Sequence, residues 1–102
     1  MVTQHLDVVL VSRKTPRDGK LEISESAAAV LRDAVDDFTV SVGEIRAHGT
    51  MESLACTCSK VASATSHVHH FIVSPVLQSL PVGIPVAVGL DRPSGTVHVT
   101  GC

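Results

Sequence analysis

The stretch FIVSPVLQSLPVGIPVAVG, Phe71 to Gly89, decides the fold. It contains two apolar runs rich in Val and Ile, and such branched side chains pack well on a pleated sheet. Between the runs, Ser74 is suited to cap a helix, Pro75 to occupy its first position, and Pro81 with Gly83 to end it. The stretch therefore predicts a strand, a short helix and a second strand.

An earlier segment, Leu21 to Gly43, has the same order: LEIS, a helical stretch, then FTVSVG. Ser24 can cap its helix, ESAAAVLRDAV, because apolar residues recur there at helical spacing. The likeness between the two segments predicts a duplicated strand-helix-strand unit. The alternative is that any strand followed by a short capped helix produces the pattern. The apolar positions of the helix are Ala27, Ala28, Leu31, Ala34 and Val35.

Further strands complete a mainly β chain. FTVSV alternates with period two, so Phe38, Val40 and Val42 share one face. About seven short strands and two short helices in 102 residues predict a single domain over residues 1–102, a small barrel or pseudobarrel that is closed or nearly so. The predicted strands are Leu6–Ser12, Leu21–Ile23, Phe38–Val42, one or two within Glu44–Ser59 around a His48–Gly49 turn, His67–Val73, Ile84–Leu90 and Thr96–Thr100, the last two joined at DRPSG.

Composition limits the function classes. The net charge of −2 argues against a generally basic coat for nucleic acid, because neutralisation of phosphates drives such binding. Four of the eight Lys and Arg residues nevertheless fall between Arg13 and Lys20, whereas three aspartates cluster between Asp33 and Asp37. Three cysteines suggest no disulfide framework, and the N-terminus has neither a basic leader nor a membrane span. A reduced, cytoplasmic setting is expected.

A second motif is the segment ACTCSKVASATSHVHHF, Ala55 to Phe71. On paired antiparallel strands, a register that joins Cys58 to His67 also joins Cys56 to His69 and Leu54 to Phe71, which places these side chains on one face and His70 on the other. Directly opposed Cβ atoms lie about 5 Å apart. Cys56, Cys58, His67 and His69 are therefore candidate ligands of a zinc ion, which accepts two thiolates and two imidazoles.

Alternatives to a zinc site remain open for this segment. Buried cysteine also behaves as a small apolar residue, and the histidines can line a solvated hairpin. A redox or catalytic cysteine, with a histidine as its base, is a further interpretation. The sequence offers no third residue that would orient the histidine. A hydrolytic zinc site would need a carboxylate base, and Glu52 is the only acid nearby in the sequence. We therefore expect that the chain is not an enzyme.

The segment SRKTPRDGK, Ser12 to Lys20, offers four cations with Ser and Thr hydroxyls on a predicted turn or arm. Cations and hydroxyls are the groups that contact phosphates, and Arg reads guanine edges. SKVASATSH, Ser59 to His67, forms a second polar loop that a barrel can place beside the first. A charge-rich solvated turn is the simpler interpretation of the first segment.

The order of elements resembles the DNA-binding pseudobarrel family, which includes the plant B-three domain and effector-binding domains of some restriction endonucleases. The residues that carry the resemblance are KTPRDGKLEI, Lys14 to Ile23, and FIVSPVLQSLPVGIPVAVGL, Phe71 to Leu90. The resemblance implies a seven-stranded fold that grips the major groove with two arms, in transcription regulation or restriction-modification. It implies contacts from Arg13, Lys14, Thr15, Arg17 and Lys20 on the first arm and from Ser59, Lys60, Ser63, Thr65 and Ser66 on the second.

The strand, short helix, strand unit is also similar to swapped-hairpin transcription regulators such as antitoxins, and two such units would let one chain close alone. Three function hypotheses follow. The first is binding of duplex DNA by two arms, the second is zinc binding by the Cys-His hairpin, and the third is a barrel that binds a small ligand or a protein. No single residue in the sequence indicates the third.

Overall fold

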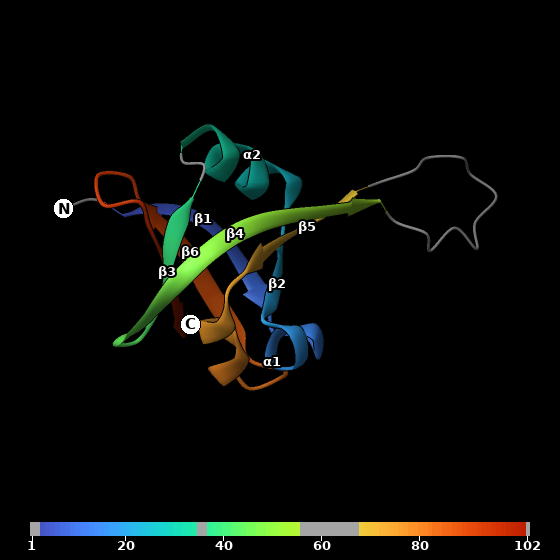
Figure 1. The fold of residues 1–102 in the computed structure, drawn as a ribbon. Coiled ribbons are helices and arrows are strands. Elements are labelled where there is room, and N and C mark those ends of the chain that lie inside the picture. The colour runs from blue at the N-terminus through green and yellow to red at the C-terminus, as the bar shows by residue number, and fades with distance from the viewer. Residues whose placement is uncertain (1–2, 35–36, 56–67, 102) are drawn as a thin grey trace.

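The computed structural model describes residues 3–34, 37–55 and 68–101, and these form a seven-stranded, nearly closed barrel-like sheet with flanking helices (Figure 1). The predicted mainly β barrel is confirmed. In chain order the elements are β1 (Gln4–Leu10), α1 (Lys14–Asp18), β2 (Lys20–Ile23), α2 (Glu25–Ala34), β3 (Phe38–Val42), β4 (Ile45–Ala55), β5 (Val68–Val73), the 3-10 helix η1 (Pro75–Ser79), β6 (Pro85–Asp91) and β7 (Thr96–Gly101).

The strands follow the order β1-β6-β7-β3-β4-β5-β2 across the sheet. Only the β3 and β7 neighbours among these strands run parallel. The two edge strands, β1 and β2, are tied together by Asp7: one carboxylate oxygen accepts the N–H of Ser24, at the start of α2, at 2.8 Å. The other accepts the N–H of Val8 at 2.9 Å. This side chain therefore bridges the open seam of the barrel.

The strand pairing has an internal two-fold relation. Of the six pairs, three are β1 with β6, β2 with β5 and β3 with β4. If three is added to each strand number, counting on from β6 to β1, then β1 with β6 becomes β4 with β3, and β2 with β5 becomes β5 with β2. The same three pairs are obtained. The predicted repeat maps onto this relation, because β2, α2 and β3 correspond to β5, η1 and β6. A duplicated unit would produce such pairing, and β7 lies outside it.

The core is aliphatic, as the composition predicts. Val86, Val88 and Leu90 on β6 are fully buried, whereas Ala87 and Gly89 between them are only half-buried and face outward. This alternation is what a barrel strand requires, because successive side chains point to opposite faces. The helix α2 covers one end of the core with its predicted apolar face, from which Ala27, Ala28 and Leu31 are buried. Phe38 is the aromatic residue of this core cluster.

Two local predictions were wrong and one needs refinement. The stretch from Lys14 to Asp18, expected to be a turn, is a short helix that ends at Gly19 in the left-handed conformation. The predicted His48–Gly49 turn is instead the middle of the eleven-residue β4. Gly49 is needed there because a Cβ would lie 2.5 Å from Val40 Cγ2 and 2.7 Å from Phe38 Cε1. Ser74 occupies the predicted N-cap position, but the helix it precedes is a 3-10 helix.

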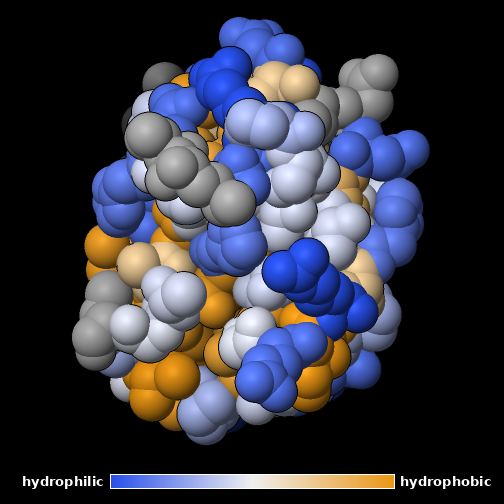
Figure 2. Space-filling view, turned by 90° about the vertical axis from the view of Figure 1, so that its left-hand side faces the viewer, coloured by the Kyte–Doolittle hydropathy of each residue, from blue (hydrophilic) through white to orange (hydrophobic). Residues whose placement is uncertain are grey.

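The surface is not evenly polar. On the side shown in Figure 2, hydrophobic residues gather in the lower half and hydrophilic residues cover most of the upper half. No helix in the described part of the chain is long and apolar enough to cross a membrane.

Candidate nucleic-acid interface

The basic segment is held on the barrel as the helix α1. Gly19 ends the helix by donating its N–H to the carbonyl of Thr15 at 2.9 Å, and its left-handed φ of 69° suits glycine. The Gln78 amide of η1 donates to the Arg17 carbonyl at 3.4 Å, and α1 packs against η1. Arg13, Lys14 and Arg17 are all exposed. Three predicted DNA-contacting cations therefore stand on one anchored element.

The other two predicted contacts on this segment have structural roles. Thr15 is completely buried, and its hydroxyl donates to the Lys20 carbonyl at 2.7 Å. Lys20 forms an ion pair with Glu52, with 2.6 Å between Nζ and Oε1. A buried hydroxyl cannot reach a phosphate, and a paired ammonium would first have to leave its carboxylate. We therefore remove Thr15 from the contact set and assign Lys20 mainly to the attachment of β2 to β4.

Phe71 forms the platform on which this segment rests. Its ring is almost fully buried, yet it lies outside the main core cluster. In the sheet it is paired with Glu22 on one side and Glu52 on the other. The ammonium groups of Lys14 and Lys20 lie 5.1 and 5.9 Å from the ring centroid, within the range of cation-π attraction. The sequence marked Phe71 only as a strand residue.

Charge is segregated between the two ends of the molecule. Figure 1 shows α1 and α2 at opposite ends of the barrel. The α1 end carries three exposed cations, of which Arg17 is paired with its neighbour Asp18 at 2.9 Å. The α2 end carries the acidic Glu25 and Asp33, with Asp37 following the helix, and one exposed cation, Arg32. An exposed pair between neighbouring residues is weak, so Arg17 can exchange Asp18 for a phosphate at small cost.

The described residues that flank the second predicted arm lie at a distance from the first arm. Strands β2 and β5 are antiparallel, and Lys20, directly after α1, pairs with Val73 at the end of β5. The residues that flank the second loop, Ala55 and Val68, pair at the other end of β5. Each connection enters its own strand of the antiparallel pair, so the two connections start at opposite ends. The predicted contacts of this loop lie outside the described residues: Ser59, Lys60, Ser63, Thr65 and Ser66.

The register of the Cys-His hairpin also needs correction. Leu54 pairs with His69 and Glu52 with Phe71, so the strands are shifted by two residues from the predicted register. An even shift keeps every side chain on its predicted face. Leu54, His69 and Phe71 accordingly share the outer face, and His70 points inward with its Nδ1 2.8 Å from the Ser53 hydroxyl. The predicted ligands Cys56, Cys58 and His67 lie outside the described residues.

His69, the fourth predicted ligand, is held by a carboxylate. Its Nδ1 lies 2.6 Å from Oε2 of Glu22 on β2. Within residues 3–34, 37–55 and 68–101, no group of three His, Cys, Asp or Glu side chains is placed to hold a metal ion. Whether His69 joins the cysteines at a metal therefore depends on the segment between β4 and β5.

No family model, curated protein or solved structure matches this chain. The resemblance to the DNA-binding pseudobarrel stays a prediction that rests on the order of elements. The geometry of the described residues is therefore the basis for a proposed function.

Proposed function

We propose that this chain binds duplex DNA, with Arg13, Lys14 and Arg17 of the α1 segment on the phosphates. The observation that carries the proposal is the exposure of these three cations on one anchored element, at the end of the barrel away from the acidic α2. Phosphates are bound chiefly by Lys and Arg, and the resulting release of counterions supplies much of the affinity. Segregated charge orients such a protein as it approaches DNA, even at a net charge of −2.

The described residues that flank the second proposed arm lie at the far end of β5 from α1. Five residue steps separate Val68 from Val73, and at about 3.4 Å each they span about 17 Å. The proposal therefore rests on α1, whose three cations suit contacts to phosphates, and such contacts position a protein on the DNA backbone without reading bases.

A double charge reversal tests the proposal. In the variant with Arg13→Glu and Arg17→Glu, we expect duplex affinity to fall at least tenfold, about 1.4 kcal/mol, at low salt, because two phosphate contacts become repulsive. We also expect the slope of log K against log salt to lose about 2 units, since each contact contributes about 0.9. The measurement is fluorescence anisotropy with a random-sequence duplex of about 20 base pairs, between about 50 and 200 mM salt.

The matched control carries the same change of charge elsewhere, as Arg32→Glu and Arg92→Glu. Arg32 lies in the last turn of α2 and Arg92 in the turn between β6 and β7, and both are exposed. This control should retain most of the affinity. Equal loss in both variants would show that only net charge matters, and unchanged affinity in the α1 variant would refute the proposal. Thermal melts of both variants establish that they fold.

A zinc site at the base of the second loop is a second proposal. The contact between His69 and Glu22 favours it, because a metal-bound imidazole usually donates its other ring N–H to a carboxylate. Cys56, Cys58 and His67 would supply the other ligands, in the two-cysteine, two-histidine set that zinc accepts. The metal would then hold the β4-β5 hairpin closed at the root of the loop.

Metal analysis of protein purified without a histidine tag tests this second proposal. We expect about one equivalent of zinc, and a melting temperature about 5 °C lower or more after chelation, because a ligand that binds the native state stabilises it. The variant His69→Gln should lose the metal. The control variant His70→Gln, at an inward-facing residue, should keep it. Absence of metal, together with an unchanged melt in chelator, would return the cysteines and histidines to packing roles.

A further inference from the structure

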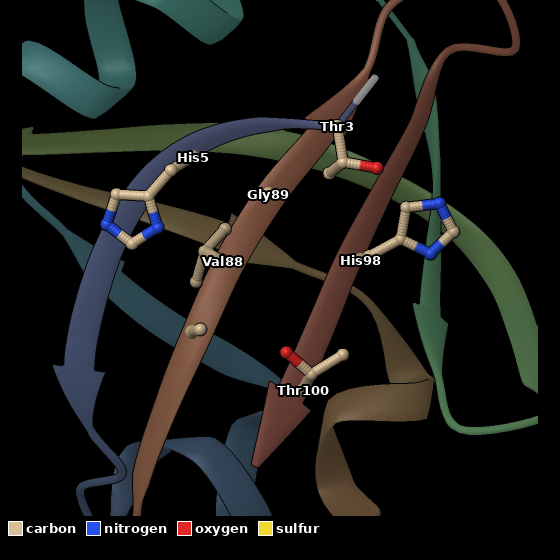
Figure 3. A pocket seen from close by; sticks show the side chains of 7 residues that line it. Thr3, His5, Val88, Gly89, His98 and Thr100 are labelled. Atoms are coloured by element: carbon tan, nitrogen blue, oxygen red, sulfur yellow. The ribbon is translucent and has the colours of Figure 1, made fainter. Parts of the chain in front are cut away.

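A hollow of about 480 Å³ lies on the outer face of the sheet, away from the α1 segment. Its floor is β6, where the outward positions are the small residues Ala87 and Gly89. Its walls come from the strands on either side: His5 from β1, and His98 and Thr100 from β7. Thr3, just before β1, also lines the hollow. Figure 3 shows the two imidazoles on either side of β6, with Thr3 towards one end of the hollow and Thr100 towards the other.

The strand pairing explains how these groups meet. His5 pairs with Gly89, and Gly89 pairs with His98, so the three residues form one row across the sheet. Two strand spacings place the backbones of His5 and His98 about 10 Å apart. Because the residue between them is glycine, no side chain of β6 stands between the imidazoles, and the Thr3 methyl group covers Gly89 instead, 2.6 Å from where a Cβ would lie. The row continues through Ser41 to the exposed Arg46, which adds positive charge on this side of the sheet.

Carboxylates are kept out of the hollow. None of the described residues that line it is acidic. The strands that form it contain two carboxylates, Asp7 and Asp91, and both are engaged elsewhere. Asp7 accepts the N–H groups of Val8 and Ser24. Asp91 is buried and accepts the Ser94 hydroxyl at 2.8 Å in the turn that follows β6.

The polar side chains of the lining are therefore hydrogen-bond donors without a competing anion, and Ala87, Val88 and Gly89 supply its apolar part. An imidazole donates an N–H in either protonation state, and a threonine hydroxyl can also donate. Donors that line one space from both sides of β6 suit a group with several acceptor oxygens. We propose that this hollow binds a phosphate group, held by His5 and His98 from the sides and by Thr3 and Thr100 from the ends. A small phosphomonoester and a nucleic-acid backbone both present such a group.

Histidine NMR signals during a phosphate titration test the inference. With inorganic phosphate and with ribose 5-phosphate at constant ionic strength, we expect saturable shifts of the His5 and His98 signals and a Kd of about 1 mM or tighter. The variants His5→Gln and His98→Gln assign the signals, and each should weaken binding at least fivefold. Both side chains lie on the outer face, so neither replacement removes core packing.

The matched control is His48→Gln, at an exposed histidine of β4 that faces Asp37 at 3.7 Å. It should leave phosphate binding unchanged. Shifts that stay linear in phosphate, or that survive in both hollow variants, would refute the inference. A second variant, Gly89→Val, puts a side chain where the Thr3 methyl group now lies, 2.6 Å from an added Cβ, and should abolish the shifts if its melt shows a folded protein.

Titration with the DNA duplex distinguishes the two sources of phosphate. If the hollow takes a small phosphomonoester, the His5 and His98 signals respond to ribose 5-phosphate and the duplex leaves them unmoved. If the hollow takes the backbone, the duplex shifts them as well and His98→Gln weakens duplex binding. Response to neither ligand would refute the inference. The residues are separate from those of α1, so loss of DNA binding in the Arg13 and Arg17 variant does not bear on this test.

Discussion

Replacing Phe71 with alanine should lower the free energy of unfolding by about 3 kcal/mol, within the range of about 3–5 kcal/mol for buried aromatic truncations. Phe71 is 2% exposed, so the replacement removes nearly all of the apolar surface that the ring buries in the folded protein. The change also removes the ring that faces the ammonium groups of Lys14 and Lys20. Each such contact is worth about 0.5–1 kcal/mol near a surface. Urea denaturation followed by far-ultraviolet circular dichroism measures the loss.

Phe71→Leu separates the packing of Phe71 from its ring chemistry. Leucine retains most of the apolar volume but presents no aromatic face to the lysines, so we expect a loss of about 1–1.5 kcal/mol. If Phe71→Ala lowers the free energy of unfolding by less than about 1 kcal/mol, the lysine side chains fill the space left by the ring. The ring would then not be needed to support α1. Because Lys14 belongs to α1, Phe71→Ala should also weaken duplex binding under the DNA proposal.

The strands and the two main helices were predictable because each has a local signal. Alternation in Phe38–Val42 follows from the burial of Phe38 and Val40 in the core, although Ser41 on the other face is buried too. The Ala and Leu spacing of α2 follows from one buried helix face. These patterns need no partner to be recognised. The turn at DRPSG and the short helix after Ser74 likewise depend on Pro, Gly and Ser in positions set by local backbone geometry.

The wrong predictions concern residues whose roles depend on distant neighbours. Gly49 resembles a turn signal, but it lies in mid-strand because Phe38 and Val40 fill the space above it. The KTPRD segment is polar and contains proline, yet it is helical where η1 packs against it. Pro16 is tolerated because it lies in the first turn, where the missing N–H costs nothing. Neither contact is visible in the local sequence.

The sites show the same limit. Exposed cations between Arg13 and Arg17 were found from their types and spacing alone. The position of the residues that flank the second arm, at the far end of β5 from α1, required the β2 and β5 pairing, which no local pattern specifies. His5 and His98 stand 93 residues apart in the sequence and line one hollow only because both pair with Gly89. Once that pairing is known, their positions at outward-facing sites of the two strands that flank β6 identify the hollow.

Gly19→Ala should destabilise the protein by about 2–4 kcal/mol and release α1. One part of this cost is the left-handed conformation at φ 69°, which takes about 1–2 kcal/mol from a residue with a Cβ. The other part is a collision, because the added Cβ would lie 2.7 Å from the backbone oxygen of Ser74. Ser74 lies at the β5-η1 junction, and its N–H donates to the Gly19 carbonyl at 2.9 Å. If Ser74 moves away to relieve the collision, this hydrogen bond breaks.

Gly43→Ala is the control that isolates this collision. Gly43 also has a positive φ, 60°, but nothing in the described part of the chain lies within 4 Å of an added Cβ, so only the conformational cost of about 1–2 kcal/mol applies. The difference between the two variants in urea denaturation should therefore be about 1–2 kcal/mol, the usual cost of overpacking. Equal losses would mean that Ser74 moves aside freely. Since Gly19 joins α1 to β2, its replacement should also lower duplex affinity where Gly43→Ala does not.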